Sequence, residues 1–370
     1  MKLAFYVPRL AGGGAQHVVV QLANGLSRRG HGVEILLNER TGPHLDNVDD
    51  RVSIASLGTA HASRAVPRLV RHLRQHRPDV LVSSLEHANA SAVLAGRLAG
   101  VVVLPVVHNM VAPLLHHEGW RIRATAWLAM QAYRHASRVI AVSSAVARDL
   151  VATMGVDPGC IDVIENPVDV DGVRRASLAG PSPDRPRPHL VAVGRLEPVK
   201  GFDVLLDAFA RVRETRGGHL TIFGEGSARD ALTARIERLD LTDAVTLAGF
   251  DPNPWPTVAR GDALVVSSHD EGFGLTLVEA MALGTPVVTT CGDGAPGDIV
   301  EGGQYGPIAR TGDAGDLAAA VGRALDAPVS ADLLVKRAAR WAPERALDRW
   351  DALLRTQRRD TPAMRWTFSS

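Results

Sequence analysis

Short apolar runs alternate along the chain with longer stretches in which apolar residues recur every three or four positions. The runs predict strands and the stretches predict helices. In the first half the predicted strands are 3–7, 33–37, 80–83, 101–107, 139–142 and 161–164. Their nearly continuous apolar character is typical of a parallel sheet that helices cover on both faces.

The alternation stops at 171–188, where Pro181, Pro183, Pro186 and Pro188 stand among Ser and Arg, a composition typical of a linker. It resumes with predicted strands at 189–193, 220–223, 245–247, 263–266 and 286–289. The pattern therefore predicts two doubly wound, Rossmann-like α/β domains, 1–170 and 189–340, that face a central cleft. Ligands of such sheets bind at the carboxyl ends of the strands.

Composition narrows the class of protein. The 370 residues include 41 Lys and Arg against 40 Asp and Glu, and 4% are aromatic. This balance disfavours nucleic-acid binding. Cys160 and Cys291 give neither a disulfide framework nor a zinc cluster, and they favour a reducing compartment. Because the apolar runs are far shorter than the ~20 residues of a membrane span, we expect a cytoplasmic protein that at most touches a membrane surface.

The most informative stretch is 269–286, which follows an apolar strand and opens a helix. Gly272 and Gly274 let a ligand approach the backbone closely, and amides at a helix start suit phosphate. Glu271 and Glu279 suit hydroxyl groups, such as a ribose diol or a sugar. The alternative is a helix cap beside a solvated acidic residue, but the two glycines and the strand–loop–helix context favour a ligand site.

A second loop of the same kind spans 194–201. It begins with Gly194 and carries Arg195 and Lys200 between a strand and a helix. An arginine can grip phosphate through two parallel hydrogen bonds, and a lysine supplies a mobile charge. The alternative is ordinary surface charge, which is less favoured because both cations share one loop at the carboxyl edge of a sheet.

Two features of the first domain are candidates for chemistry. The glycines at 12–14 follow the first strand, but His17 stands where a dinucleotide-binding fingerprint has its third glycine, so dinucleotide binding is disfavoured. His108 follows strand 101–107 and is expected to face the cleft. Among the 14 histidines we find no helical H-x-x-x-H pair with an acid nearby, and adjacent His116 and His117 point apart, so we predict no metal site.

The motifs together resemble the family 4 retaining glycosyltransferases, which have the GT-B fold, over nearly the whole chain. The resemblance is carried by EGFGLTLVEAMALGTPVV from Glu271, with its E-x7-E spacing to Glu279, and by GRLEPVKG, FGEG, ENPVD and GGGAQHVVVQLANGLSRRGH. The chain departs from the family at Gln16 and His17, where a glutamate is common, and at Asp298, where many members have Glu.

The resemblance implies roles for individual residues. Arg195 and Lys200 would bind the diphosphate of a nucleotide-sugar, Glu271 the transferred sugar and Glu279 the ribose, while His108 would face the reacting sugar. Asn166 lies where the chain crosses toward the second domain, and segment 341–370 would contain a helix that returns to the first domain, burying Trp350, and a dispensable tail. The other expected donor-binding residues are Gly13, Gly14, Gly194, Gly224, Phe250, Gly272, Phe273, Gly274 and Leu275.

The predicted function is retaining transfer of a hexose-type sugar from a nucleotide-diphosphate-sugar, with UDP as the default nucleotide and without a metal or other cofactor. The acceptor stays open between a lipid-linked glycan, a polysaccharide and a small metabolite. Two alternatives are a nucleotide-sugar epimerase of similar fold and a non-catalytic subunit that binds nucleotide-sugars. The basic stretches 62–78 and 120–138 allow peripheral membrane contact, although a core-facing apolar stripe with a solvated arginine face is favoured.

Overall fold

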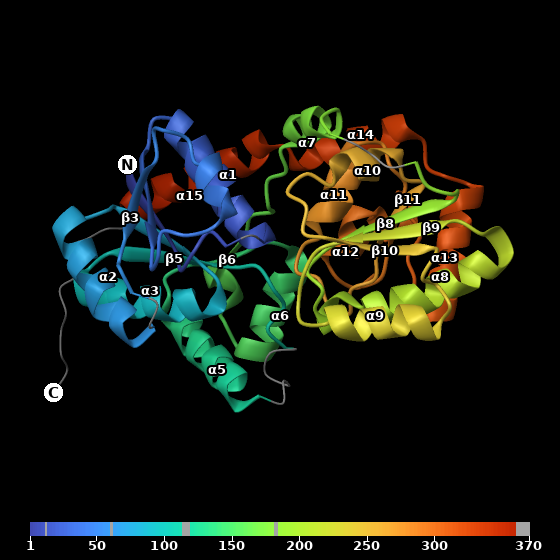
Figure 1. The fold of residues 1–370 in the computed structure, drawn as a ribbon. Coiled ribbons are helices and arrows are strands. Elements are labelled where there is room, and N and C mark those ends of the chain that lie inside the picture. The colour runs from blue at the N-terminus through green and yellow to red at the C-terminus, as the bar shows by residue number, and fades with distance from the viewer. Residues whose placement is uncertain (12, 60–61, 113–118, 181–183, 360–370) are drawn as a thin grey trace. The chain divides into compact units, whose positions relative to one another are not determined.

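The computed structural model describes residues 1–11, 13–59, 62–112, 119–180 and 184–359, and it divides into two compact units (Figure 1). Unit 1 comprises Met1–Pro167 together with the chain from Pro343 onward, and unit 2 comprises Val168–Ala342. Each unit is built around a parallel sheet covered by helices, so the predicted pair of doubly wound α/β domains is confirmed.

Among the described residues, unit 1 forms a seven-stranded sheet in the order β3-β2-β1-β4-β5-β6-β7. The strands are β1 (Lys2–Val7), β2 (Gly32–Leu37), β3 (Ser53–Ser56), β4 (Val80–Ser84), β5 (Val102–Val107), β6 (Val139–Ala141) and β7 (Ile161–Val163). The helices are α1 (Gly14–Arg28), α2 (Ala62–His76), α3 (Glu86–Ala99), α5 (Trp120–His135), α6 (Ser144–Met154) and α15 (Pro343–Arg359). Strand β3 was not predicted, because this edge strand is only half buried and has no apolar run.

Unit 2 forms a five-stranded sheet within the described chain, in the order β10-β9-β8-β11-β12. The strands are β8 (His189–Val193), β9 (His219–Phe223), β10 (Val245–Gly249), β11 (Ala263–Val266) and β12 (Val287–Thr289). The helices are α7 (Val170–Ser177), α8 (Phe202–Arg216), α9 (Arg229–Arg238), α10 (Trp255–Arg260), α11 (Leu275–Ala282), α12 (Ala295–Ile299), α13 (Ala314–Asp326) and α14 (Ala331–Ala338). The strand order reverses between β8 and β11, which is where ligands bind in open α/β sheets.

The segment that we predicted as a linker, 171–188, begins in a helix instead. Helix α7 occupies Val170–Ser177, and the Asp169 side chain caps it by accepting a hydrogen bond from the Gly172 amide at 2.8 Å. Val170 and Val173 bury one side of the helix. Because the prolines begin only after this helix, composition placed the start of the linker too early. Pro181 and Pro183 lie outside the described residues.

The last helix, α15, belongs to unit 1 and packs on α1 (Figure 1). The Leu347 side chain lies against Gly25, where any added Cβ would come within 2.6 Å of a leucine methyl carbon. Trp350 is 1% exposed, and the Asp351 carboxylate accepts a hydrogen bond from Arg29 at 2.8 Å and lies 2.8 Å from His31 Nε2. Helix α15 therefore completes the unit that residues 1–167 form.

The basic helices of unit 1 differ in where their apolar residues lie. In α2, Leu69 and Leu73 are fully buried in the core, so its apolar stripe faces inward. In α5, Trp127 and Leu128 are more than half exposed. Within the described part of the chain, no helix combines the length and apolar character that a membrane crossing needs.

Candidate functional site

Two loops meet at the switch point of unit 2, one after β8 and one after β11. The His269 amide donates to the Val199 carbonyl at 2.8 Å, and the Ser267 hydroxyl donates to the Lys200 carbonyl at 2.9 Å. Gly201, at φ +60°, allows this close approach, because a Cβ there would lie 2.2 Å from the Ser267 carbonyl oxygen. Gly201, which ends the predicted phosphate loop, therefore allows the two loops to pack closely together.

Lys200 and Glu271, which were predicted from separate motifs, form an ion pair across these loops. The distance from Lys200 Nζ to Glu271 Oε2 is 2.6 Å, and the side chains are 21% and 19% exposed. The Ser268 hydroxyl donates to the same carboxylate oxygen at 3.2 Å. Ser268 was not predicted, because a serine in a loop gives no signal before the fold places it beside the carboxylate. The carboxylate fixes the ammonium group at the edge of the sheet.

Arg195 lies in the same loop as Lys200 but points to solvent. It is exposed, and among the described residues its guanidinium forms no hydrogen bond or ion pair. The neighbouring Leu196 is fully buried, and its amide donates to the Glu225 carbonyl at 3.0 Å. The backbone of the loop is therefore held in place while the arginine side chain stays available to a ligand.

Glycines let the ends of β8 and β9 approach each other. The Gly194 amide donates to the Phe223 carbonyl at 2.9 Å, and a Cβ on Gly224 would lie 1.8 Å from the Gly194 carbonyl oxygen. Phe250, which directly follows β10, is 59% exposed. The ends of β8 and β9 therefore pack closely through their backbones, and an exposed aromatic ring follows β10.

Helix α11 begins at Leu275, directly after the glycine loop. Gly274, at φ +105°, is its N-cap and has no side chain to bind the first amides. Phe273 is buried beside Gly272, and its ring meets that of Trp341 edge to face at 6.4 Å between centroids. The aromatic contact anchors the loop, and the start of the helix has the properties of an anion-binding site.

Glu279 lies in the second turn of α11 and is buried. Its side chain is 9% exposed, and burial raises the pKa of the carboxyl group to about 8. No hydrogen bond or ion pair joins the carboxyl group to any residue that the structure describes. At neutral pH the group is therefore mostly protonated, which lets it donate as well as accept a hydrogen bond.

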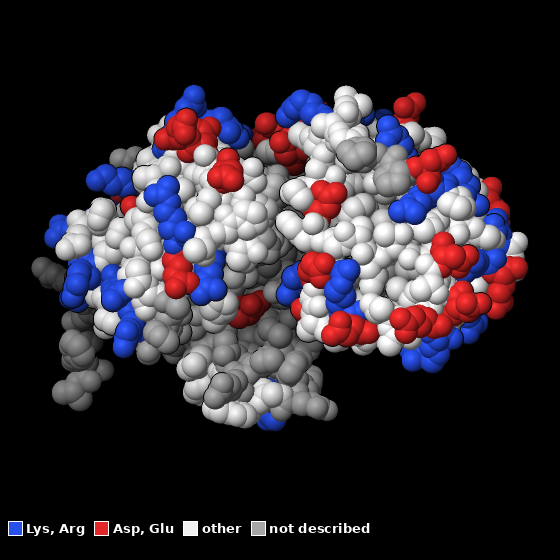
Figure 2. Space-filling model, viewed as in Figure 1, with Lys and Arg blue, Asp and Glu red and all other residues white. Residues whose placement is uncertain are grey.

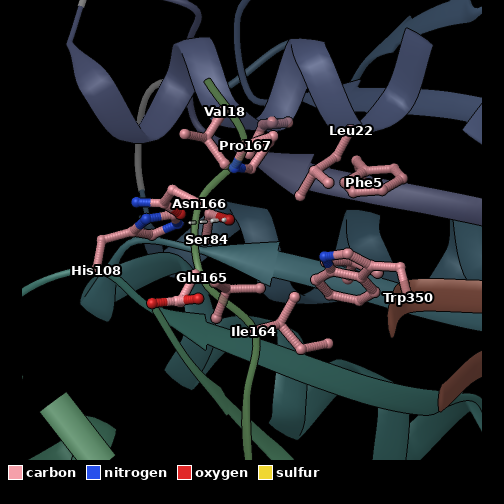
Figure 3. A pocket seen from close by; sticks show the side chains of 13 residues that line it. Phe5, Val18, Leu22, Ser84, His108, Ile164, Glu165, Asn166, Pro167 and Trp350 are labelled. Carbon is pink, nitrogen blue, oxygen red and sulfur yellow. Dashed lines mark hydrogen bonds between the residues drawn. The ribbon is translucent and has the colours of Figure 1, made fainter. Parts of the chain in front are cut away.

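In unit 1, His108 directly follows β5 and is 8% exposed. Burial lowers the pKa of its imidazole to about 4, so the ring is neutral at neutral pH. Its Nε2 lies 3.4 Å from the Ser84 hydroxyl, and Asn166 and Trp350 line the same cavity (Figure 3). The cavity of about 10 Å³ holds no more than a water molecule. A sugar therefore does not fit inside it, and Ser84 is a neighbour that the sequence did not reveal.

Two of the predicted donor-binding glycines lie at the start of α1. Gly13, at φ +150°, precedes the helix and Gly14 is its first residue. The Gly13 carbonyl accepts a hydrogen bond from the His17 amide at 3.1 Å. Gly12 lies outside the described residues.

Both halves of the chain match known protein families. Residues 12–171 match the family described as Glycosyltransferase Family 4, and residues 177–341 match Glycosyl transferases group 1. A glycogen synthase of Mycobacterium tuberculosis is 29% identical over 94% of this chain and 89% of its own length. A D-inositol 3-phosphate glycosyltransferase of Mycobacterium sp. (strain KMS) is 36% identical over 50% of this chain and 45% of its own.

Solved structures share the fold. Sucrose-phosphate synthase from Thermosynechococcus elongatus superposes with a TM-score of 0.81 at 19% identity, covering 97% of this chain and 100% of that one. Anabaena HepE in complex with UDP-glucose gives 0.80 at 21% identity, covering 96% and 100%. The matched domains, the named relatives and the shared two-domain architecture identify this chain as a glycosyltransferase of the group 1 and family 4 type with the GT-B fold.

Proposed function

We propose that this glycosyltransferase moves a hexose-type sugar from a nucleotide-diphosphate-sugar, with UDP as the nucleotide, to an acceptor hydroxyl with retention of configuration. The observation that carries the proposal is the Lys200–Glu271 pair at the switch point of unit 2, beside the start of α11. A cation and a helix N-terminus suit the phosphates of such a donor, and a carboxylate suits its sugar hydroxyls. Structures of the neighbour HepE contain UDP and UDP-glucose, which supports this choice of donor.

The diphosphate leaving group would be bound by Lys200, Arg195 and the first amides of α11. The ammonium group has three donors, and the ion pair with Glu271 occupies one direction, so the others remain for phosphate oxygens. Fixed positive groups at the point where charge develops lower the barrier without reorganising. In this proposal they neutralise the departing diphosphate without a metal ion.

The two glutamates would bind hydroxyl groups of the donor. Glu271 is held by Lys200 and Ser268, so its carboxylate is oriented before the sugar arrives. Glu279 is buried and mostly protonated, so it can exchange two hydrogen bonds with a ribose diol. Gly194, Gly224, Gly272, Gly274 and Leu275 would supply backbone contacts, and Phe250 would lie beside the base.

Unit 1 would contribute three residues to the proposed transfer site, namely His108, Gly13 and Gly14. A neutral imidazole can accept a hydrogen bond from a sugar hydroxyl without adding positive charge. In the proposed transfer, the acceptor oxygen bonds to the anomeric carbon on the face from which the phosphate oxygen leaves. The hydroxyl proton passes to that departing oxygen, so configuration is retained. We place the reaction in the cytoplasm, and the acceptor is a lipid-linked glycan, a polysaccharide or a small metabolite.

Labelled nucleotide-sugars test the proposal directly. A thermal-shift panel of donors first selects the nucleotide, and the selected donor is then incubated with acceptors of the three classes. Transfer of label to an acceptor with an unchanged anomeric configuration is expected. A changed sugar formed without acceptor would indicate an epimerase, and binding without turnover would indicate a non-catalytic subunit.

Variants test the assigned roles. Lys200→Ala and Arg195→Ala should each lower turnover by about 10²–10³, the usual loss of one group that stabilises transition-state charge. Lys336→Ala, which changes an exposed lysine on α14, is the matched control. Full turnover in a folded Arg195→Ala and Lys200→Ala double variant would remove both residues from the site.

A further inference from the structure

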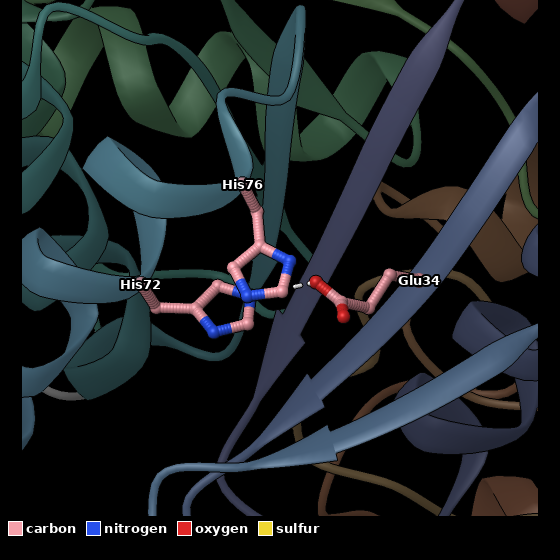
Figure 4. A group of neighbouring side chains, drawn as sticks. All are labelled: Glu34, His72 and His76. Carbon is pink, nitrogen blue, oxygen red and sulfur yellow. Dashed lines mark hydrogen bonds and ion pairs between the residues drawn. The ribbon is translucent and has the colours of Figure 1, made fainter.

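Three side chains with metal-ligating atoms converge on the surface of unit 1, between β2 and α2. They are Glu34, His72 and His76, and their ligating atoms all lie within 4.8 Å of one another (Figure 4). The sequence prediction of no H-x-x-x-H pair near an acid is wrong at this point. His72 and His76 form such a pair, and the acid stands 38 positions before His72, on a strand that only the fold brings close.

Secondary structure holds the three residues in place. Glu34 lies in β2, with Ala4 and Ser53 as its partners on the flanking strands. His72 and His76 are four residues apart on α2, so they project from one face of the helix. Leu69 and Leu73 of the same helix are fully buried in the core cluster that also contains Leu36. Because α2 and β2 are packed together, their ligating side chains come from a rigid platform.

The three side chains already contact one another. His72 Nε2 lies 2.7 Å from Glu34 Oε2, and these side chains are 13% and 20% exposed. The rings of His72 and His76 stack at 4.0 Å between centroids with planes 8° apart, and both lie beside the carboxylate (Figure 4). His76 is exposed, so its ring has room on the solvent side to leave the stack. A hydrogen bond joins the His72 imidazole to the Glu34 carboxylate, and a bound metal ion would take its place.

We propose that Glu34, His72 and His76 bind one divalent transition-metal ion of the zinc class. Two imidazoles and one carboxylate form a common three-ligand set for zinc, with water in the fourth position. Nitrogens bound to one tetrahedral zinc at about 2.05 Å are roughly 3.3 Å apart, so the His76 ring has to turn out of its stack with His72 until both nitrogens point at the ion. The ion replaces the hydrogen bond between His72 and Glu34 and cross-links β2 to α2.

The surrounding charge does not close the site to a cation. Helix α2 is rich in arginine, but among the described residues the ion-pair partner of Glu34 is His72 and not an arginine, so the carboxylate remains available to a cation. Arg68 and Arg74 bind backbone carbonyls of Leu57, Gly58 and Leu98 instead. None of the three ligands belongs to the proposed donor site. The bound metal is therefore a structural cross-link, and sugar transfer does not depend on it.

The experiment titrates the full-length protein, freed of metal by chelation and dialysis, with zinc chloride at pH 7.5 in a calorimeter. One saturable ion per chain is expected, together with a rise in the melting temperature, since a ligand of the folded state stabilises it. Cobalt(II) should give the visible absorption of a site of low coordination number. His76→Gln should weaken zinc binding at least tenfold and His72→Gln by a similar factor, whereas His135→Gln, at an exposed histidine of α5, should bind as the parent does.

Two results would overturn the proposal. One is a chain that takes up no saturable zinc under these conditions. The other is a His76→Gln variant that keeps the parent affinity and the parent shift in melting temperature. Because His76 is exposed, its replacement is not expected to disturb the fold, and far-UV circular dichroism of the variant verifies this.

Discussion

Ending the chain at Ala342 should unfold unit 1 and leave unit 2 folded. This truncation removes α15, whose large buried side chains are Leu347, Trp350, Leu353 and Leu354, between 0% and 8% exposed. At about 1.5–3 kcal/mol for each such side chain, the lost contacts amount to roughly 6–12 kcal/mol. The free energy of unfolding of a whole domain is only about 5–15 kcal/mol. The truncated unit 1 therefore retains little or no stability.

Limited proteolysis with mass spectrometry measures this effect for each unit separately. The truncated chain should yield a resistant fragment close to Val168–Ala342, while a control chain that ends at Arg359 should protect both units. The cut is made after Ala342 because Trp341 packs on Phe273 within unit 2 and must stay. Equal protection of residues 1–167 in both chains would refute the reasoning.

A single substitution tests the same contact with less disruption. Trp350→Ala should destabilise unit 1 by about 3–5 kcal/mol, the usual cost of emptying a buried tryptophan site. Trp127→Ala is the matched control, since Trp127 is 53% exposed and should cost less than about 1 kcal/mol. The readout is the urea midpoint by far-UV circular dichroism, and equal midpoints for the two variants would contradict the predicted role of α15.

Three further predictions concern unit 2. Transfer activity should survive EDTA, and a loss that Mg²⁺ or Mn²⁺ restores would show that a metal handles the diphosphate charge. Because burial raises the pKa of Glu279 from 4.5 to about 8, the folded chain keeps a proton that the unfolded chain releases, so stability to urea should fall as pH rises from about 4.5 to 8. Glu279→Gln should flatten that fall, and an unchanged slope would argue against the buried, protonated carboxyl. Gly201→Ala should destabilise more than Gly302→Ala in thermal melts, because both glycines have left-handed φ and ψ angles but only the first would push a Cβ against a carbonyl oxygen; equal melting temperatures would contradict this reading.

The sequence revealed most of the strands because parallel strands buried on both faces are continuous apolar runs. Strand β3 was not predicted because it lies at an edge of the sheet and is only half buried. Helix α7 escaped because a proline-rich segment follows it directly and dominates the composition. Both errors have one cause, since local composition does not report the burial of two or three side chains.

The candidate site was less readable than the fold. Motifs pointed separately to Lys200 and to Glu271, but nothing in the sequence indicates that the two side chains touch. The contacts of Ser268 and Ser84 are likewise set by loops that meet only in three dimensions. The Glu34–His72–His76 cluster combines a helical spacing, which is visible in the sequence, with a strand residue, which is not.

The discontinuous make-up of unit 1 has a consequence for how the protein is synthesised. Its first 167 residues leave the ribosome long before α15, which starts at Pro343. At about 5–20 residues per second, the intervening unit 2 takes on the order of ten to thirty seconds to translate. During that interval unit 2 can fold from its own contiguous chain, while the α1 surface that α15 will cover is open to other apolar chains. Nascent unit 1 is therefore exposed to aggregation until α15 has been synthesised and covers this surface.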